Sequence, residues 1–244
     1  MKELVGVMDS GVGGLTILKQ LTERSSYNFL YVADHAYCPY GTKPEQVVLR
    51  RADTVTGYFR DVGASAVVIA CNTASRFAER LSDKYGLPVY DVVRPTCRQV
   101  LSITKNKRVA LLATNATVKG GAYRKLLEPS GITVYDFPCS SFVPFIEQNA
   151  TDTLSCFKAA DEALSDMPKC GADTVILGCT HFPLMLRQIA YYCAGAQIVQ
   201  CGCDLPCGDS QEDSAVKYLT TGNVDFAANA SKWYGDVRFE HITL

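Results

Sequence analysis

Short apolar runs alternate with longer amphipathic stretches along the chain. The apolar runs are strand-sized and nearly continuous, which is typical of parallel strands covered by helices on both faces. They lie at residues 4–8, 28–32, 66–70, 88–93, 108–113, 133–137, 174–177 and 197–199. The amphipathic stretches predict helices at residues 14–25, 44–62, 76–85, 96–104, 121–128, 154–167, 184–193 and 209–220. This alternation predicts an α/β protein that binds its ligand at the carboxyl ends of the strands.

One segment of the chain is repeated. Residues 63–73, GASAVVIACNT, align without gaps on residues 171–181, GADTVILGCTH, and each copy places a cysteine directly after an apolar run. The repeat predicts two similar parallel-sheet βαβ lobes related by pseudo-symmetry, with the active site in the cleft between them. Cys71 and Cys179 are then expected to face each other across that cleft.

The boundary between the lobes is expected near Pro95. The first lobe would comprise residues 1–95 together with 207–244, and the second would comprise residues 96–206. The segment after residue 207 has no counterpart in the repeat, so we expect it to pack back as helices on one lobe.

Composition excludes several classes of protein. The chain has 24 Lys and Arg against 25 Asp and Glu, so its net charge of −1 creates no field that would attract nucleic acid or an anionic membrane. No apolar run approaches the length that spans a bilayer. Eleven cysteines are an odd number, and the apolar stretch near the N-terminus is too short for a signal peptide. We therefore expect a reduced, cytoplasmic protein with no membrane and no nucleic-acid partner.

The two repeated cysteines are the first candidates for chemistry. A cysteine between a strand and a helix lies where backbone N–H groups and the helix dipole stabilise a thiolate, so a lowered thiol pKa is expected. Side chains that can donate hydrogen bonds follow each one, namely Asn72 and Thr73 after the first and Thr180 after the second. A small buried hydrophobe is the alternative for any single cysteine. Two at matching positions favour catalysis.

A glycine-rich loop, DSGVGG at residues 9–14, follows the first strand. Its glycines let backbone amides approach an anion, which predicts a nest for a small carboxylate, with Asp9 and Ser10 beside it. Thr16 stands where a dinucleotide fingerprint needs glycine, and the loop lacks the lysine of a P-loop. An ordinary turn is the alternative reading.

Three further positions point to the same edge of the sheet. Tyr40 and Gly41 belong to a turn that can offer amides to a ligand. His181 is two residues beyond Cys179. Glu147 lies in an apolar segment, which tends to raise a carboxyl pKa.

Seven segments together resemble the glutamate racemases of the aspartate/glutamate racemase family. They are DSGVGGL at 9–15, CPYGTK at 38–43, ACNTA at 70–74, ATNAT at 113–117, FVPFIE at 142–147, LGCTHFPL at 177–184 and YLTTG at 218–222. The resemblance covers nearly the whole chain. It implies a racemase without cofactor or metal that interconverts L- and D-glutamate, supplies D-glutamate for peptidoglycan, and forms a homodimer by default.

The resemblance also implies residue roles. Cys71 and Cys179 would be the acid and base, because inverting an α-carbon requires a proton to leave one face and another to arrive at the opposite face. Asp9, Glu147 and His181 would assist them. The positions expected to bind substrate are Asp9, Ser10, Tyr40, Gly41, Asn72, Thr73, Thr117, Thr180 and His181, with Thr114 a weaker candidate. The two carboxylates of the substrate would be held by hydroxyls and backbone amides. The hydroxyls are those of Ser10, Thr73 and Thr180, and the amides are those of Gly11, Gly41 and Asn72.

Several features leave alternatives open. Arg94 stands where the family usually has an acidic residue, and His35 where it usually has Thr or Ser. A related racemase acting on aspartate or another amino acid, or a catalytically silent amino-acid-binding protein, are the competing hypotheses. A further alternative is a zinc site formed by Cys201, Cys203 and Cys207 with Cys193. It is disfavoured because the spacing of these cysteines is not a strong zinc pattern.

Overall fold

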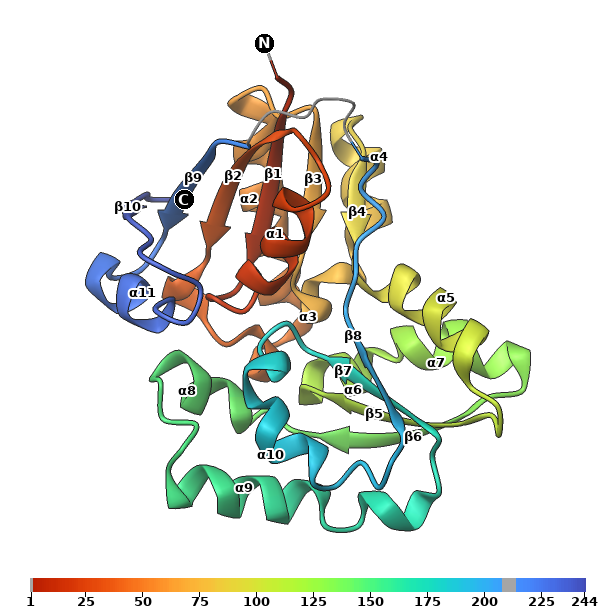
Figure 1. Cartoon of the computed structure of the whole chain (residues 1–244). Helices are drawn as coiled ribbons and strands as arrows, with labels where there is room; N and C mark the ends of the chain where they lie inside the picture. The colour runs from red at the N-terminus through yellow and green to blue at the C-terminus, as the bar shows by residue number, and fades with distance from the viewer. Residues whose placement is uncertain (1, 208–213) are drawn as a thin grey trace.

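The computed structural model describes residues 2–207 and 214–244, and it contains two sheets in which every strand pair is parallel (Figure 1). The first sheet has the order β10-β9-β2-β1-β3-β4 and the second β6-β5-β7-β8. The strands are β1 Leu4–Asp9, β2 Asn28–Ala33, β3 Ala66–Ile69, β4 Val89–Asp91, β5 Arg108–Ala113, β6 Thr133–Pro138, β7 Thr174–Gly178, β8 Gln197–Gln200, β9 Val216–Thr220 and β10 Phe239–His241.

The two sheets share one strand order. Within the first sheet β2-β1-β3-β4 are neighbours, and the second sheet places β6-β5-β7-β8 in the equivalent order. The repeated sequence segments therefore fall on β3 and β7, which occupy equivalent positions. The predicted α/β class with two similar parallel-sheet lobes is confirmed.

Helices surround both sheets, as expected for parallel strands buried on both faces (Figure 1). The α-helices are α1 Leu15–Thr22, α2 Glu45–Asp61, α3 Asn72–Ser75, α4 Ala78–Tyr85, α5 Val93–Ile103, α6 Asn115–Gly120, α7 Ala122–Leu127, α8 Phe142–Glu147, α9 Leu154–Leu164, α10 Leu186–Ala190 and α11 Val224–Ala230. The sequence pattern missed α3, α6 and α8, which are too short to display a helical period.

The C-terminal segment corrects two expectations. Residues 216–220 form strand β9 and not the end of a helix over 209–220, whose residues 209–213 lie outside the described part. Together with β10 and α11, β9 extends the first sheet beside β2, so the segment adds strands as well as a helix. The five residues Val216–Thr220 carry no clear period of their own, and parallel pairing with β2 makes them a strand.

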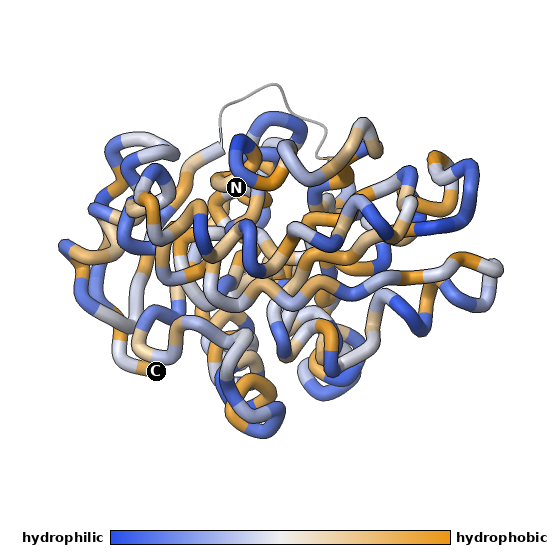
Figure 2. The backbone as a smooth tube through the Cα atoms, turned by 90° about the horizontal axis from the view of Figure 1, so that it is seen from below, coloured by the Kyte–Doolittle hydropathy of each residue, from blue (hydrophilic) through white to orange (hydrophobic). Residues whose placement is uncertain are grey.

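Apolar side chains from the strands form the interior of each lobe, and the hydrophobic stretches in Figure 2 run through the centre of the molecule. Helix α2 shows how the helices attach, because its Val48, Ala52, Val55 and Phe59 share one face and are buried. Among the described helices, none is long and apolar enough to cross a membrane. The expected lobe boundary near Pro95 falls inside α5.

Candidate active site

The carboxyl ends of strands from both sheets converge on one small cavity. Its lining residues are Ser10, Pro39, Tyr40, Gly41, Cys71, Asn72, Thr73, Thr114, Val143, Cys179, Thr180 and His181. These residues follow β1, β3, β5 and β7 or lie in the loop after β2 and in α8. The cavity volume is about 10 Å³, room for roughly one water molecule. The structure is therefore closed around this point.

Most residues predicted from the sequence line this cavity. Asp9, Glu147 and Thr117 do not line it but lie one contact behind, against Thr180, His181 and Thr73 respectively. Sequence reasoning missed Pro39 and Val143, and it treated Thr114 as a weak candidate. The first two are apolar, so only their place in the segments CPYGTK and FVPFIE could have indicated them.

Cys71 and Cys179 both line the cavity and are almost completely buried, with 5% and 7% of their surface exposed. Burial raises the pKa of the Cys71 thiol well above its ordinary value, and the charge of Asp9 raises it further. The amides of Ala74 and Thr73 oppose this effect but are outweighed. The predicted lowering of the pKa is therefore wrong for Cys71, because desolvation exceeds what the start of the four-residue helix α3 can offer.

Cys179 has a basic partner. Its Sγ lies 3.8 Å from Nδ1 of His181, whose Nε2 lies 2.6 Å from Oε1 of Glu147. Burial lowers the pKa of His181, but hydrogen bonds and charge from Cys179 and Glu147 prevail and raise it well above its ordinary value. Such a histidine can take up the thiol proton and remain beside the resulting thiolate.

Glu147 is an ionised carboxylate, contrary to the expectation from its apolar segment. Burial raises its pKa, yet hydrogen bonds and charge from His181 and His35 outweigh this and hold the pKa well below its usual range. The amide of Val12 donates a further hydrogen bond to Oε1 at 2.9 Å. These partners lie far away in the sequence, so the local pattern could not reveal them.

The glycine-rich loop holds carboxylates of the protein itself. Oδ2 of Asp9 accepts hydrogen bonds from the amides of Gly14 at 3.0 Å and Gly11 at 3.3 Å, while the amide of Val12 binds Glu147. The prediction of a nest for a substrate carboxylate is therefore wrong for these three amides, and the amide of Gly11 is already occupied. Burial raises the Asp9 pKa, opposed by the charge of His181 and by the two amides.

Hydroxyl groups join the two lobes at the cavity. Oγ1 of Thr73, after β3, lies 3.0 Å from both Oγ1 of Thr114 and Oγ1 of Thr117, and the latter two are 2.9 Å apart. Thr180 places its hydroxyl 3.4 Å from Oδ1 of Asp9 and equally far from Nδ1 of His181. These groups can reorient to donate to an oxyanion.

Asn72 is held from behind by Tyr123 and Cys201. Its Oδ1 accepts a 2.6 Å hydrogen bond from the Tyr123 hydroxyl, and its Nδ2 lies 3.2 Å from Sγ of Cys201. Cys201 is thus a buried neighbour of the site and not a bystander. Cys193 packs in the core beneath α10, apart from the cluster of Cys201 and Cys203. Within residues 2–207 and 214–244 no three His, Cys, Asp or Glu are grouped to hold a metal.

The two departures from the family pattern differ in location. Arg94 lies on the surface, where it pairs with Glu79 at 2.8 Å and with Asp91 at 3.8 Å. Exposed pairs of this kind contribute little to stability. His35 is buried against Glu147.

Comparison with known proteins agrees with this geometry. A family model described as Asp/Glu/Hydantoin racemase matches residues 10–202. The chain is 34% identical to a glutamate racemase of Carnobacterium sp. over 100% of this chain and 99% of the relative. It is 36% identical to that of Aquifex pyrophilus over 80% of this chain and 77% of the relative. The crystal structure of glutamate racemase from Francisella tularensis in complex with D-glutamate has 25% identity and a TM-score of 0.85, covering 99% and 98% of the two chains.

Proposed function

Because the chain belongs to the Asp/Glu/Hydantoin racemase family, we propose that it interconverts L- and D-glutamate and that Cys71 and Cys179 move the α-proton. One observation carries the proposal. The two cysteines follow equivalent strands of the two sheets and line a single cavity. Opposed groups of this kind are what inversion of a carbon requires.

In the proposed mechanism one thiolate removes the α-proton, so that the Cα–H bond breaks and an S–H bond forms. The opposite thiol then gives its proton to the other face of the same carbon. The net change is inversion, and each enantiomer is a substrate for one cysteine. The raised pKa of Cys71, due to burial and Asp9, favours its thiol form, and Sγ of Cys179 lies 3.8 Å from Nδ1 of His181, with which it can exchange a proton. The roles exchange in the reverse direction.

Charge on the reacting substrate must be stabilised within this cavity. Of its lining residues in the described chain, none is Lys or Arg, and His181 is the one group that can carry positive charge. Hydroxyls of Ser10, Thr73 and Thr180 and the turn at Tyr40–Thr42 therefore supply the donors for the carboxylates. Burial strengthens these donors, because a site without water has a low effective dielectric.

Glutamate cannot fit a cavity of about 10 Å³, so the lobes or loops must separate for binding. A neighbouring hollow of about 600 Å³ shares Gly41 and Thr73 with the cavity and is lined by Lys43, Arg76 and Lys119. Glu45 also lines the hollow and pairs with Arg76 at 3.3 Å, so Lys43 and Lys119 leave it an excess of positive charge. We propose that this is the route of access, because the two lysines attract a dicarboxylate.

Cellular role and assembly follow as proposals. All eleven cysteines are unpaired, which supports a reducing cytoplasm. D-Glutamate would there serve peptidoglycan synthesis.

Leu154 and Phe157 expose apolar surface on α9 that a second copy of the chain would cover in a homodimer. Analytical sedimentation tests this assembly.

Circular dichroism at a wavelength where the enantiomers differ tests the substrate. We expect L-glutamate and D-glutamate each to reach the racemate. Aspartate should react with about 10- to 200-fold lower kcat/KM, since one methylene changes the free energy by roughly 1–3 kcal/mol. Faster turnover of aspartate would reject the glutamate assignment, and binding without turnover of any amino acid would reject the racemase mechanism.

A further inference from the structure

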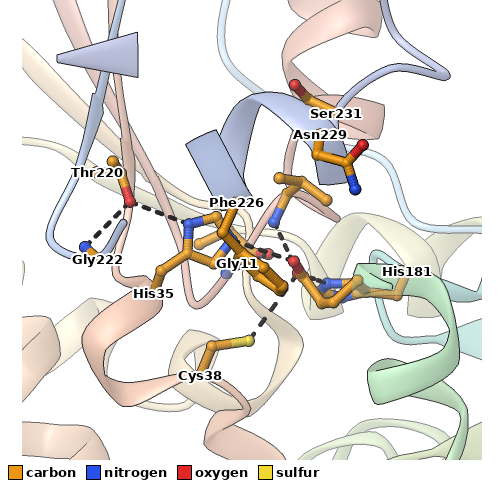
Figure 3. Close-up of polar contacts among 12 residues, drawn as sticks. Gly11, His35, Cys38, His181, Thr220, Gly222, Phe226, Asn229 and Ser231 are labelled. Carbon is orange, nitrogen blue, oxygen red and sulfur yellow. Dashed lines mark hydrogen bonds and ion pairs between the residues drawn. The ribbon is translucent and has the colours of Figure 1, made fainter. Parts of the chain in front are cut away.

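His35 connects the C-terminal strands to the carboxylate behind His181 (Figure 3). It begins the short turn after β2, and its side chain is only 3% exposed. Its Nε2 lies 3.1 Å from Oε2 of Glu147, and its Nδ1 lies 3.0 Å from Oγ1 of Thr220 at the end of β9. The ring of Phe226 from α11 contacts it edge to face.

The hydrogen bonds assign the proton on the His35 ring. The ionised carboxylate of Glu147 can only accept, so Nε2 of His35 carries a proton and donates it to Oε2. Nδ1 of His35 lies 3.0 Å from Oγ1 of Thr220, which also accepts a hydrogen bond from the amide of Gly222. His35 is therefore held by Thr220 while it donates to Glu147.

Both oxygens of Glu147 are consequently engaged from opposite sides. Oε2 receives His35, and Oε1 receives Nε2 of His181 and the amide of Val12. A carboxylate held at both oxygens cannot rotate. It keeps a proton on Nε2 of His181, so that Nδ1 is the nitrogen that faces Sγ of Cys179 at 3.8 Å and exchanges a proton with it.

A second contact also joins the end of α8 to the first lobe. Nδ2 of Asn149, two residues beyond Glu147, donates to the carbonyl of Asn229 in α11 at 2.7 Å. The end of α8 is therefore attached to the first lobe at two points, Glu147 to His35 in the turn after β2 and Asn149 to Asn229 in α11. Both contacts join the second sheet's helices to elements of the first sheet.

We propose that His35 is a positioning residue for proton transfer at Cys179: by holding Glu147, it fixes the Nε2 side of the His181 ring, directs Nδ1 at Cys179 and couples the strand β9 to the site. This inference rests on the proposed two-thiol mechanism. It requires no change of charge on His35. Asp9, Tyr31 and Cys38 are also close enough to Glu147 for its charge to act on them. The thiol of Cys38 lies 3.9 Å from Oε1 of Glu147, and burial raises its pKa so that it stays neutral.

Two substitutions test the role of the donor. His35→Leu removes it while keeping an apolar side chain, and His35→Gln retains an N–H that can reach Glu147. We expect His35→Leu to lower kcat about tenfold or more, since hydrogen bonds to charged groups are the strong ones, and His35→Gln to stay within about threefold of wild type. His241→Gln, at an exposed histidine of β10, is the matched control.

Isotope effects separate positioning from general loosening. Enantiomers have equal free energy, so kcat/KM must fall equally in both directions. The primary isotope effect with α-deuterated substrate should instead rise for the enantiomer whose proton Cys179 removes, and fall for the other, because only the Cys179 step is slowed. Equal changes of the isotope effect in the two directions would show that His35 has only a structural role.

Nitrogen NMR of the histidine rings provides a readout that does not depend on turnover. The chain has 3 histidines, so each ring is resolvable. In wild type we expect a proton on Nε2 of His35, and in His35→Leu the proton position or charge of His181 should change. If that variant unfolds, Thr220→Val removes the hydrogen-bond partner of His35 Nδ1 and should change the ring-nitrogen signals of His35 and His181.

These experiments distinguish a wrong role for His35 from a wrong two-thiol mechanism. An unchanged His181 spectrum and wild-type kcat in folded His35→Leu would overturn the inference alone. Retained racemisation after loss of either cavity cysteine would overturn the two-thiol mechanism instead.

Discussion

Sγ of Cys179 lies 3.8 Å from Nδ1 of His181, the ring nitrogen that faces away from Glu147. Cys71 occupies the equivalent place in the other sheet but is subject to burial and to the negative charge of Asp9, both of which raise its pKa. Equivalent strand positions thus give two thiols in unlike surroundings, one beside a base and one kept protonated. The proposed mechanism uses this asymmetry, because it gives the two thiols different neighbours for proton exchange.

Removing either thiol should abolish racemisation. We expect Cys71→Ala and Cys179→Ala each to reduce kcat by roughly 10²–10⁴ or more, because an essential proton-transfer group is lost. Thermal unfolding should show that both variants fold. Turnover above about a tenth of wild type, a barrier change below about 1.4 kcal/mol, would contradict the assignment. Cys207→Ser, at an exposed position, is the control.

Stability should depend on pH through Glu147. Its folded pKa lies well below the ordinary value of 4.5, so the unfolded chain binds the proton first as pH falls. The contribution is present above about pH 4.5 and is lost as pH decreases toward the folded pKa. Urea unfolding between pH 6 and 3 should therefore show a steeper loss in wild type than in Glu147→Gln. Parallel curves for the two proteins would argue against an ionised Glu147 in the folded state.

Salt should slow substrate capture if the hollow beside Gly41 is the route of access. The double variant Lys43→Gln with Lys119→Gln is expected to lower kcat/KM about tenfold at low ionic strength and to flatten its salt dependence, because it removes the two lysines that line the hollow. Stopped-flow or initial-rate kinetics across a salt series measures this. Lys169→Gln, an exposed lysine paired with Asp166, removes a charge elsewhere and should change nothing. A salt dependence identical in all three proteins would place the route elsewhere.

Cys201 should matter to the site through Asn72. Cys201→Ala removes the sulfur that contacts Asn72 and the carbonyl of Leu177, and we expect a loss of about 1–3 kcal/mol in unfolding free energy and a higher KM. Chemical denaturation and steady-state kinetics measure the two effects. Elemental analysis of wild type completes the test: a full equivalent of zinc, lost when Cys201, Cys203 and Cys207 are replaced together, would support the metal site instead.

The amino-acid sequence by itself determined the architecture and the two cysteines. Continuous apolar runs indicate strands buried on both faces, and the match of residues 63–73 with 171–181 places Cys71 and Cys179 after equivalent strands. These are local properties, because strand burial and position after a strand depend on a few neighbouring residues. The sequence pattern did not reveal helices α3 and α8, because a helix of one or two turns is too short to show a helical period.

Only the tertiary structure decided the electrostatics and the last strands. The pKa of Glu147 depends on His35 and His181, and that of Cys71 on desolvation by both lobes, none of which is local in sequence. The amides of the glycine loop bind Asp9 and Glu147 because folding brings these carboxylates to them. Strand β9 exists because the edge of β2 was open to pair with it. Long-range contacts therefore set the pKa values of the site residues. The local sequence pattern sets the strands and helices that bring these residues together.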